Sequence, residues 1–436
     1  MWGNLLVGAV AGVAVVVAAR MMSPIDYHLN KPYLQRVLRR QGVLTATDRV
    51  QKLRVQRMPV AATEDLNLER VFQRVELQLA GGQVRYLVAQ SFYPLAILFE
   101  QREREKKSMA ASLMEFNPYQ LRPTMITESG LQSVKEDPMK NEAEEARVKL
   151  QKIERLNEEV GQLRRLNEVT DLYPRLINFD PKALLTLTAD VGGQRLDDAL
   201  LQLTADERFR LLEGLVRQIA RAHQAALPVV EYLLPGMQYT ESILHNLLEF
   251  SISLWPKAGV SVTEGELYEL QQLMAPVVSQ LVATERGLKL GEATPRSFYY
   301  DGSKCQKLDW GMARHDLSCF DVAELVCDPT AGLSLEQEAA LAECYQRERQ
   351  LPDDVQRDIA YASIVYRLIL SGYICQYIAH YDEMTPEQRE QLGGLGWTRE
   401  NLYGLWSRLA EQTGRFPELT DLSAWYEQVK LPVQAL

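Results

Sequence analysis

The N-terminal end of the chain is a continuous apolar run. Leu5–Ala19 carries no charge, and Trp2–Ala19 has about the minimum length of a membrane-spanning helix. Positive residues follow this run, which by the positive-inside bias places the bulk of the chain in the cytoplasm or an equivalent reducing compartment. A cleaved signal peptide would carry a basic segment in front, which Met1–Asn4 lacks. We therefore expect a transmembrane helix over residues 1–22, contacting the membrane through residues 4–19; a cleaved presequence or a buried helix are the alternatives.

Two glycines lie four residues apart within this apolar run. Gly8 and Gly12 form a GxxxG pattern that permits close helix contact in lipid, and so a homo- or hetero-oligomer. The alternative is that small residues simply fill the span.

Helical and β patterns then follow one another. Tyr27–Arg57 has a helical, basic pattern, as expected of a membrane-proximal segment. Val71–Leu79 and Gln83–Phe92 alternate in part between apolar and polar positions and are joined at Gly81-Gly82, which predicts a β-hairpin. A charged helix is expected over Leu95–Leu113.

A stretch without periodicity separates this part from a second helical pattern. Asn117–Lys140 is rich in Pro, Ser, Thr and Met and predicts a loop or insertion. Glu142–Glu168 predicts one helix packed on a sheet, because its apolar repeat is too short for a coiled coil. Strands are expected at Tyr173–Ile177 and Ala183–Ala189.

The C-terminal half predicts mainly helices. Asp190–Leu196 contains Gly192-Gly193, which suits a connection between two lobes. Thr204 and Glu207 have the spacing of a capping box that opens the next helix. Ser334 and Thr385-Pro386 open further helices, and Val355–His380 is apolar enough for the centre of a helical core, although its polar residues make it a poor membrane span.

Composition narrows the classes of function. The net charge is -10, which argues against nucleic acid as the main partner, because phosphate binding needs a basic surface. The five cysteines lack metal-ligand spacing and have apolar neighbours, so we expect free, mostly buried thiols rather than a zinc site.

The segment Lys289–Leu325 resembles the catalytic segment of a kinase with several working residues exchanged. The aminoglycoside phosphotransferase and choline kinase group has a His-Gly-Asp, a Pro-x-Asn, a strand ending in Asp and a later Tyr-Asp-Leu-Ala. The matching positions here are Gly291, Pro295, Asp309 and Asp321, whereas Leu290, Glu292 and Ser297 depart from the pattern. The resemblance covers the chain from about Val71 to the C-terminus, and its specific part is Asp190–Leu325.

This resemblance implies an α+β, two-lobed kinase-like fold with a small, mainly antiparallel β lobe and a larger helical lobe. It implies a small lobe at residues 67–190, with an insertion at about 117–140, and a large lobe at 191–436 with the catalytic-like segment 289–325. The apolar and basic patterns before these lobes give a transmembrane anchor at residues 1–22 and a basic membrane-proximal segment at 23–66.

The resemblance also implies roles for single residues. Glu292 occupies the position of the catalytic base, and Asp309 with Ser297 occupies the metal-binding positions. Asp321 and His223 take structural roles, the first by bracing the catalytic loop. ATP and Mg²⁺ are the implied cofactors, although the sequence does not firmly require either.

The lysine that would contact the triphosphate has two candidate positions. If Gln83–Phe92 is the third strand, the position belongs to Ala89 or Gln90 and no lysine is present. In an alternative register the strand is Leu131–Glu136, and Lys135 would pair with Glu144 or Glu145. No glycine-rich phosphate loop precedes either position.

These departures predict a membrane-anchored pseudokinase-like scaffold or assembly subunit that binds partner proteins at the inner membrane face. Two alternatives remain: an active Mg²⁺-dependent phosphotransferase acting on a small-molecule or lipid-borne hydroxyl, and a nucleotide-sensing module without turnover.

Overall fold

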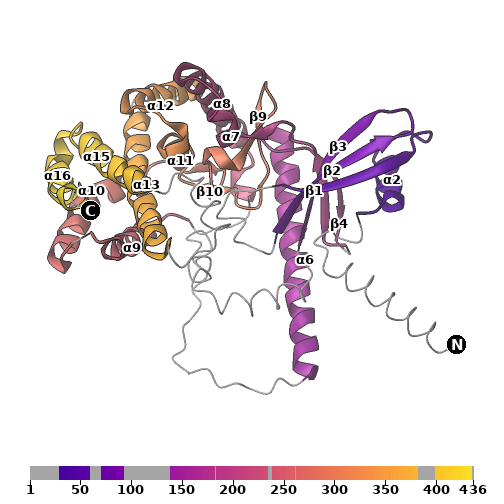
Figure 1. Cartoon of the computed structure of the whole chain (residues 1–436), viewed down its shortest axis with the longest axis horizontal. Helices are drawn as coiled ribbons and strands as arrows, with labels where there is room; N and C mark the ends of the chain where they lie inside the picture. Colours follow the sequence, from indigo (N-terminus) through magenta and orange to yellow (C-terminus); the bar gives the residue numbers. More distant parts are fainter. Residues whose placement is uncertain are drawn as a thin grey trace.

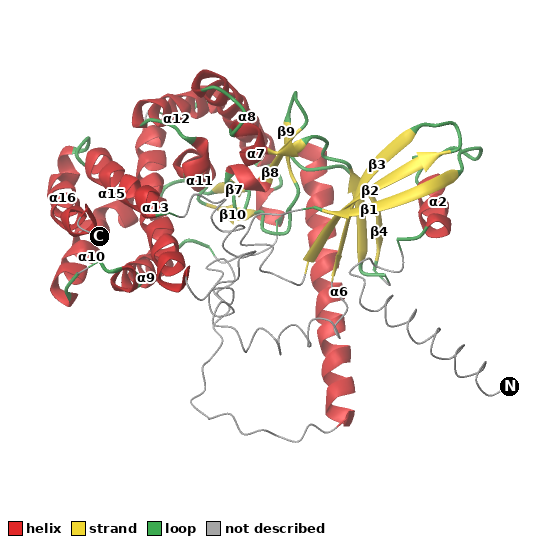
Figure 2. Cartoon of the chain, in the orientation of Figure 1, coloured by secondary structure: helices red, strands yellow, loops and turns green. Residues whose placement is uncertain are grey.

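A computed structural model describes residues 29–58, 70–92, 138–181, 183–233, 238–260, 262–352, 354–381 and 398–434. The expected anchor, the helix at Leu95–Leu113, Lys135 and the Thr385-Pro386 helix start lie outside these residues, as does the part of the expected insertion before Pro138. A sheet-containing lobe and a helical lobe lie at opposite ends of the described chain, with a long helix beside the sheet (Figures 1 and 2).

The small lobe is built on an antiparallel sheet in the order β1-β2-β3-β5-β4. The strands are β1 (Val50–Arg57), β2 (Arg70–Leu79), β3 (Val84–Phe92), β4 (Leu176–Asp180) and β5 (Leu185–Ala189). The predicted hairpin is confirmed, because β2 and β3 pair from Arg70↔Phe92 to Gln78↔Val84. Its turn needs a glycine, since Gly82 has a φ of 77°.

The sheet is covered on both faces. Helix α2 (Lys31–Arg40) packs on one face, where Leu34 and Leu38 join a core with Val75 and Leu87. The long helix α6 (Pro138–Val169) lies on the other face, where Leu163 shares a core with Phe72 and Val88. Strand side chains alternate between faces, so the residues of β2 and β3 divide between these two cores.

The expected helix over 27–57 is wrong in its second half. In the described part of this range, residues 29–57, the α-helix is Lys31–Arg40; Gly42 follows with a φ of 69°, and Val50–Arg57 forms β1. This strand pairs with β2, from Val50↔Leu79 to Arg57↔Gln73. The basic residues of this segment therefore divide between α2 and the edge strand β1 and do not follow one helical face.

Two strand boundaries differ from the prediction for local reasons. Tyr173 and Pro174 precede β4, because the Asn167 side-chain amide donates hydrogen bonds to both of their carbonyl oxygens and its Oδ1 accepts from the Leu176 amide. β5 begins only at Leu185, because Leu184 has a φ of 51°, the conformation of a turn.

Contacts at Asp190 and at Gly193 fix the connection between the lobes. The Arg74 guanidinium makes a two-pronged ion pair with Asp190, with Nε–Oδ1 and Nη2–Oδ2 distances of 2.9 and 3.0 Å. Gly192 and Gly193 have φ angles of 72° and 53°. A Cβ at Gly193 would lie 1.6 Å from the Tyr300 carbonyl oxygen, so only glycine fits there.

The large lobe is helical, with short strands at its junction with the small lobe. Its α-helices are α7 (Leu196–Leu200), α8 (Ala205–Ala226), α9 (Glu241–Ser253), α10 (Glu264–Ala283), α11 (Cys319–Cys327), α12 (Leu335–Arg349), α13 (Asp354–His380), α15 (Arg399–Thr413) and α16 (Thr420–Gln434). Its strands form a pair, β7 (Gly287–Lys289) and β10 (Arg314–Asp316), and a sheet in the order β6-β8-β9, made of β6 (Gln194–Arg195), β8 (Phe298–Tyr300) and β9 (Cys305–Lys307). Short 3₁₀ turns occur at Val230–Tyr232, Trp255–Ala258, Pro295–Ser297, Pro329–Ala331 and Pro417–Leu419.

Local caps and burial confirm several predictions for this lobe. Thr204 and Glu207 form the predicted capping box of α8, and Ser334 caps α12. α13 is the one helix in the described ranges that is long and apolar enough to cross a membrane, and 83% of its most apolar window is buried, as predicted for a core helix. All five cysteines are free and buried.

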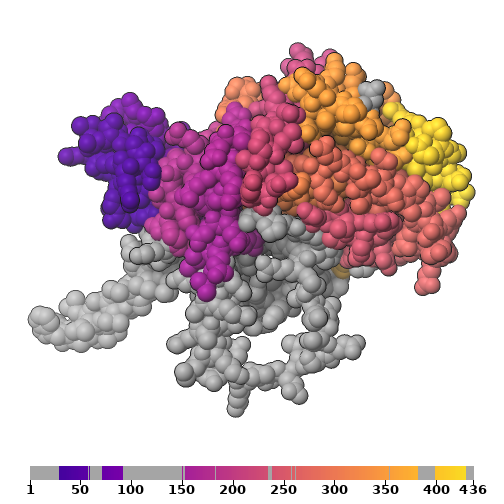
Figure 3. All heavy atoms as spheres, turned by 180° about the vertical axis from the view of Figure 1, so that it is seen from behind, coloured from indigo at the N-terminus to yellow at the C-terminus, as the bar shows by residue number. Residues whose placement is uncertain are grey.

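One hydrophobic core extends from the sheet into the large lobe. Phe72 and Val88 of the small lobe belong to the same buried cluster as Leu308 and Trp310. Seen from behind, the N-terminal sheet and the C-terminal helices occupy opposite ends of the molecule with the α6 region between them (Figure 3).

Candidate functional site

Of the two strand positions expected for the triphosphate lysine, Ala89 and Gln90, the second carries a buried polar side chain. Gln90 lies on β3, is 1% exposed and faces α6. Its Nε2 donates a hydrogen bond of 3.4 Å to Oε2 of Glu159, a carboxylate that is itself 1% exposed. The Arg155 side chain completes the contact, with Nε 3.1 Å from Glu159 Oε1. Glu159 is thus satisfied by an amide and an arginine, without a lysine from the sheet. Lys135, the other candidate, lies outside the described residues.

A second buried glutamine, Gln162 of α6, binds the loop that follows β9. Gln162 is fully buried, and its Nε2 lies 2.6 Å from each of the carbonyl oxygens of Trp310 and Ala313. The Trp310 ring in turn meets the Phe72 ring edge-on, with the centroids 6.1 Å apart. The loop that follows Asp309 is therefore fixed to α6 by hydrogen bonds and to β2 by aromatic packing.

The two candidate metal-binding residues are buried and engaged locally. Asp309 follows β9, is 3% exposed, and its Oδ1 accepts a hydrogen bond of 3.0 Å from the Gly311 amide. Ser297 ends the turn Pro295–Ser297, is 4% exposed, and its Oγ donates to the Thr294 carbonyl oxygen at 2.8 Å. In the described part of the chain, no group of three or more His, Cys, Asp and Glu side chains has the geometry of a metal site.

The candidate base lies in the loop between β7 and β8. Glu292 is half-buried, and its Oε1 accepts a hydrogen bond of 3.0 Å from the Thr294 hydroxyl. Its neighbour Gly291 has a φ of 93°, and a Cβ there would lie 2.5 Å from Met312 Cβ. Backbone conformation and lack of space for a Cβ therefore explain why Gly291 matches the glycine of the family's His-Gly-Asp, and this match is no evidence of activity. Leu290, which replaces the family's histidine, is fully buried.

A buried network of charged side chains connects this loop to α11. Lys289 Nζ lies 3.1 Å from Asp321 Oδ1 and 2.8 Å from Glu324 Oε1, and all three side chains are 0% exposed. Asp321 Oδ2 accepts from the Leu290 amide at 2.8 Å, and Glu324 Oε2 accepts from the Ala293 amide at 2.7 Å. These contacts join α11 to the backbone on both sides of Gly291.

His223 of α8 also contacts this network. Its Nε2 lies 3.0 Å from Asp321 Oδ2, and its Nδ1 lies 2.7 Å from the Tyr345 hydroxyl. His223 is 1% exposed and is held between two helices, as expected of a structural residue. Asp321 likewise has a structural role, because it contacts His223, Lys289 and the Leu290 amide.

Burial and mutual attraction set the protonation of these groups. Burial lowers the pKa of His223, although its contact with Asp321 opposes the shift. Burial acts to raise the pKa of Asp321, but the Lys289 ammonium and the His223 hydrogen bond outweigh it, so this pKa is lowered. Burial raises the pKa of Glu324. The pKa of Lys289 is raised despite its burial, because Glu324 and Asp321 stabilise the ammonium. Lys289 therefore remains charged.

These residues do not fit the group that the resemblance implies. A nucleotide triphosphate with Mg²⁺ requires a cation on the phosphates and carboxylates on the metal. Gln90 supplies no charge, Asp309 is the one carboxylate at the candidate metal positions, and the β1–β2 connection at residues 59–69 contains no glycine.

One set of atoms near Asp309 has no partner. Within the described residues, Lys307 Nζ, Tyr173 Oη and Trp310 Nε1 are buried without a hydrogen bond. The Lys307 amide binds the Leu172 carbonyl oxygen at 2.8 Å, which brings the Tyr173 segment beside β9. Burial, with the negative charges of Asp321 and Asp309, raises the pKa of Tyr173, so its hydroxyl remains a donor.

Several residues of the site were not predicted: Glu159, Gln162, Lys289 and Glu324. Glu159 and Gln162 lie close to the apolar stripe formed by Leu156, Val160 and Leu163, and a polar residue beside such a stripe is a usable signal for a buried contact. Lys289 and Glu324 flank the quoted motifs, but nothing in the sequence alone distinguishes them from solvent-exposed charges.

Comparison with known proteins yields similarities of structure. No protein-family model matches the chain, and no curated protein matches it. A protein from Ralstonia eutropha, described as an aminoglycoside phosphotransferase, has a TM-score of 0.48 at 12% identity, over 88% of this chain and 98% of that one. Choline kinase from Cryptosporidium parvum has a TM-score of 0.46 at 9% identity, over 91% and 99%. Choline kinase LicA from Streptococcus pneumoniae has a TM-score of 0.41 at 10% identity, over 85% and 99%.

At these identities the likeness concerns the fold alone. In structure the chain is similar to aminoglycoside phosphotransferases and choline kinases.

Proposed function

We propose that this chain is a non-catalytic, pseudokinase-like protein that binds partner proteins as a scaffold or assembly subunit. The observation that supports this most is the buried contact between Gln90 and Glu159, at one of the two positions expected for the lysine that phosphoryl transfer requires. A neutral amide cannot balance the charge of a triphosphate, and charge stabilisation makes the largest contribution to this class of catalysis.

The other working positions support the same proposal. The Ser297 hydroxyl is directed to a backbone carbonyl, and Asp309 to a backbone amide. Glu292 places its carboxylate one methylene farther from the backbone than an aspartate would, and displacements near 1 Å reduce catalysis by about 100-fold. Each change alone is tolerable; together they leave no complete set of groups for the reaction.

The retained contacts are those that make the fold rigid. Gln162 fixes the loop after Asp309 to α6, and Lys289 with its carboxylates fixes the loop around Gly291 to α11. A scaffold needs a fixed arrangement of surfaces and does not need an open cleft, so selection for binding accounts for this pattern.

The proposed place of action rests on the N-terminal sequence. Residues 4–19 are proposed to anchor the chain in a membrane, with the bulk at its inner face, and Gly8 with Gly12 offers a contact for a second helix. Alkaline carbonate extraction of membranes tests this proposal: the full chain should stay in the pellet and a chain lacking residues 1–22 should not. Release of the full chain would contradict it.

A phosphoryl-transfer assay tests the absence of catalysis. The full chain in detergent is incubated with radiolabelled ATP and Mg²⁺, beside Asp309→Asn. Active kinases of related mechanism turn over at roughly 1–100 per second. We expect the two proteins to give the same background rate. A rate that is clearly above this background and is lost in Asp309→Asn would contradict the proposal and favour the phosphotransferase alternative.

A second candidate function, anion or nucleotide sensing without turnover, is favoured by one observation. Lys307 Nζ is fully buried and has no hydrogen-bond partner within the described residues, and burying a polar group without a hydrogen bond is costly. A bound phosphate group would satisfy it. Phosphate or ADP should then raise the melting temperature of the wild type but not of Lys307→Met. If neither ligand has an effect and Lys307→Met is itself more stable, Lys307 is only an unfavourable core residue.

A further inference from the structure

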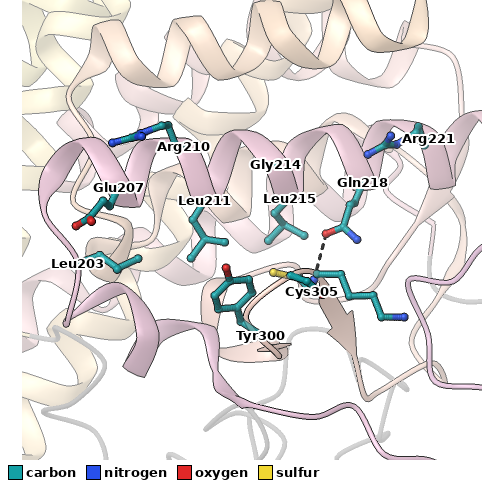
Figure 4. A pocket seen from close by; sticks show the side chains of 12 residues that line it. Leu203, Glu207, Arg210, Leu211, Gly214, Leu215, Gln218, Arg221, Tyr300 and Cys305 are labelled. Atoms are coloured by element: carbon teal, nitrogen blue, oxygen red, sulfur yellow. Dashed lines mark hydrogen bonds between the residues drawn. The ribbon is translucent and has the colours of Figure 1, made fainter.

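A groove runs along α8 on the large lobe, between this helix and the β8–β9 hairpin. Its volume is about 570 Å³, and none of Gln90, Glu292, Ser297 and Asp309 lines it. Leu211 and Leu215 point from α8 toward Tyr300 and Cys305 of the hairpin, and Arg210 and Arg221 lie on the edge of the same helix that is turned away from the hairpin (Figure 4).

The groove follows one face of the helix over several turns. Glu207, Leu211, Gly214, Gln218 and Arg221 are spaced by four, three, four and three residues, which places them on one stripe. Arg210 and Arg221 are eleven residues apart, so about 16 Å of helix separates them. This length suits an extended or helical segment of a polypeptide better than a compact small molecule.

A glycine without a local structural role lies in the middle of this stripe. Gly214 is exposed, lies inside α8 and has no atom within 4 Å of where a Cβ would be. Glycine inside a helix costs about 1 kcal/mol relative to alanine. No turn, left-handed conformation or packing contact explains this cost. Close approach of another chain to the helix backbone does explain it.

The charges lining the groove are mainly positive, although the chain has a net charge of -10. The one lining carboxylate, Glu207, is engaged by the Thr204 amide and hydroxyl at 2.9 and 2.7 Å. The cations are held loosely. Arg221 Nε is 3.7 Å from Glu348 Oε1, Lys304 Nζ is 4.0 Å from Asp171 Oδ2, and the Arg210 Nε donates to a backbone oxygen of its own helix.

Such exposed contacts contribute between about 0 and 1 kcal/mol, so an incoming carboxylate can replace them. Acidic residues at the two ends of a bound segment would meet Arg210 and Arg221, and an apolar residue between them would contact Leu211 and Tyr300.

We propose that this groove docks a short acidic segment of a partner protein, with an apolar side chain inserted between α8 and the β8–β9 hairpin over Gly214. The inference goes beyond the proposed loss of catalysis, because it concerns a different surface and stands whether or not the cleft between the lobes binds nucleotide.

A fluorescence-anisotropy titration of the full chain in detergent tests the docking surface. The probe is a labelled synthetic peptide of about fourteen residues with glutamates at both ends and two central leucines, long enough to span the distance between the two arginines. Matched peptides carry lysine for glutamate, or serine for leucine. We expect micromolar binding of the first peptide, weakening with added salt, and at least tenfold weaker binding of both matched peptides.

Variants of α8 separate the groove from the rest of the surface. Arg210→Gln with Arg221→Gln should weaken binding at least tenfold, whereas Arg217→Gln, on the same helix but outside the groove, should change it less than twofold. Gly214→Trp should fill the groove and abolish binding. Gly214→Ala should raise the melting temperature and retain binding within about threefold.

Three results would overturn the proposal: no binding of the acidic peptide at millimolar concentration, equal binding of the lysine peptide, or equal binding to Gly214→Trp. Binding of a short anionic amphiphile such as dodecyl phosphate in place of the peptide would also overturn it, because the occupant would then be a small molecule or lipid.

Discussion

Replacement of Lys289 by methionine should strongly destabilise the large lobe. The ammonium lies 3.1 Å from Asp321 Oδ1 and 2.8 Å from Glu324 Oε1, and the three side chains are shielded from water. Methionine keeps most of the side-chain volume, so little of the effect arises from a cavity. Removing one partner of a buried ion pair leaves an uncompensated charge and costs about 3–5 kcal/mol. We expect a loss in this range for Lys289→Met.

Urea unfolding followed by tryptophan fluorescence measures this loss. Lys304→Met is the matched control, because Lys304 is 40% exposed and 4.0 Å from Asp171, so it should cost less than about 1 kcal/mol. The double variant Lys289→Met/Glu324→Gln should recover part of the loss, with a coupling energy of about 1 kcal/mol or more, because it removes one of the two stranded carboxylates. A loss for Lys289→Met no larger than that of the control would refute the account of the network.

Two further predictions concern pH and the hinge. The pKa of His223 is lowered in the folded protein, so the unfolded chain binds this proton first as the pH falls. The free energy of unfolding is therefore retained above the ordinary pKa of 6.5 and should decrease below it, by at most about 1.4 kcal/mol per pH unit. Melting curves of His223→Gln should show a smaller decrease with pH. An unchanged slope in this variant would contradict the assignment. Gly193→Ala would bring a Cβ to 1.6 Å from the Tyr300 carbonyl oxygen and should cost at least about 3 kcal/mol in urea unfolding, whereas Gly81→Ala, with open space around its Cβ, should change stability by less than about 0.5 kcal/mol. Equal effects of the two alanines would show that the hinge relaxes freely.

Local patterns predicted the elements whose causes are local. The hairpin of β2 and β3 followed from alternation and a glycine turn, and the start of α8 followed from the Thr204 capping box. The strand at Val50–Arg57 was missed, because its basic residues suit an exposed edge strand as well as a helix, and its partner β2 lies beyond residues 59–69 in the sequence.

The contacts that define the site join residues far apart in the chain. Gln162 reaches Trp310 across 148 positions, and His223 reaches Asp321 across 98. No periodicity or motif encodes such pairs. The resemblance to a kinase segment supplied the positions of Gln90 and Asp309. The geometry then showed what the sequence leaves open, namely that Glu159 is paired with an amide and that Lys289 holds the catalytic-like loop.

A thermal-shift titration with Mg²⁺ and ATP tests the central claim most directly. The full chain and Asp309→Asn are heated in detergent with nucleotide up to about 10 mM; a site with a dissociation constant of about 0.1 mM would then add about 2.7 kcal/mol of stability. The account predicts no rise in melting temperature for either protein, because Gln90 supplies no charge at the strand position expected for the triphosphate lysine. A rise that requires Mg²⁺ and disappears in Asp309→Asn would contradict it.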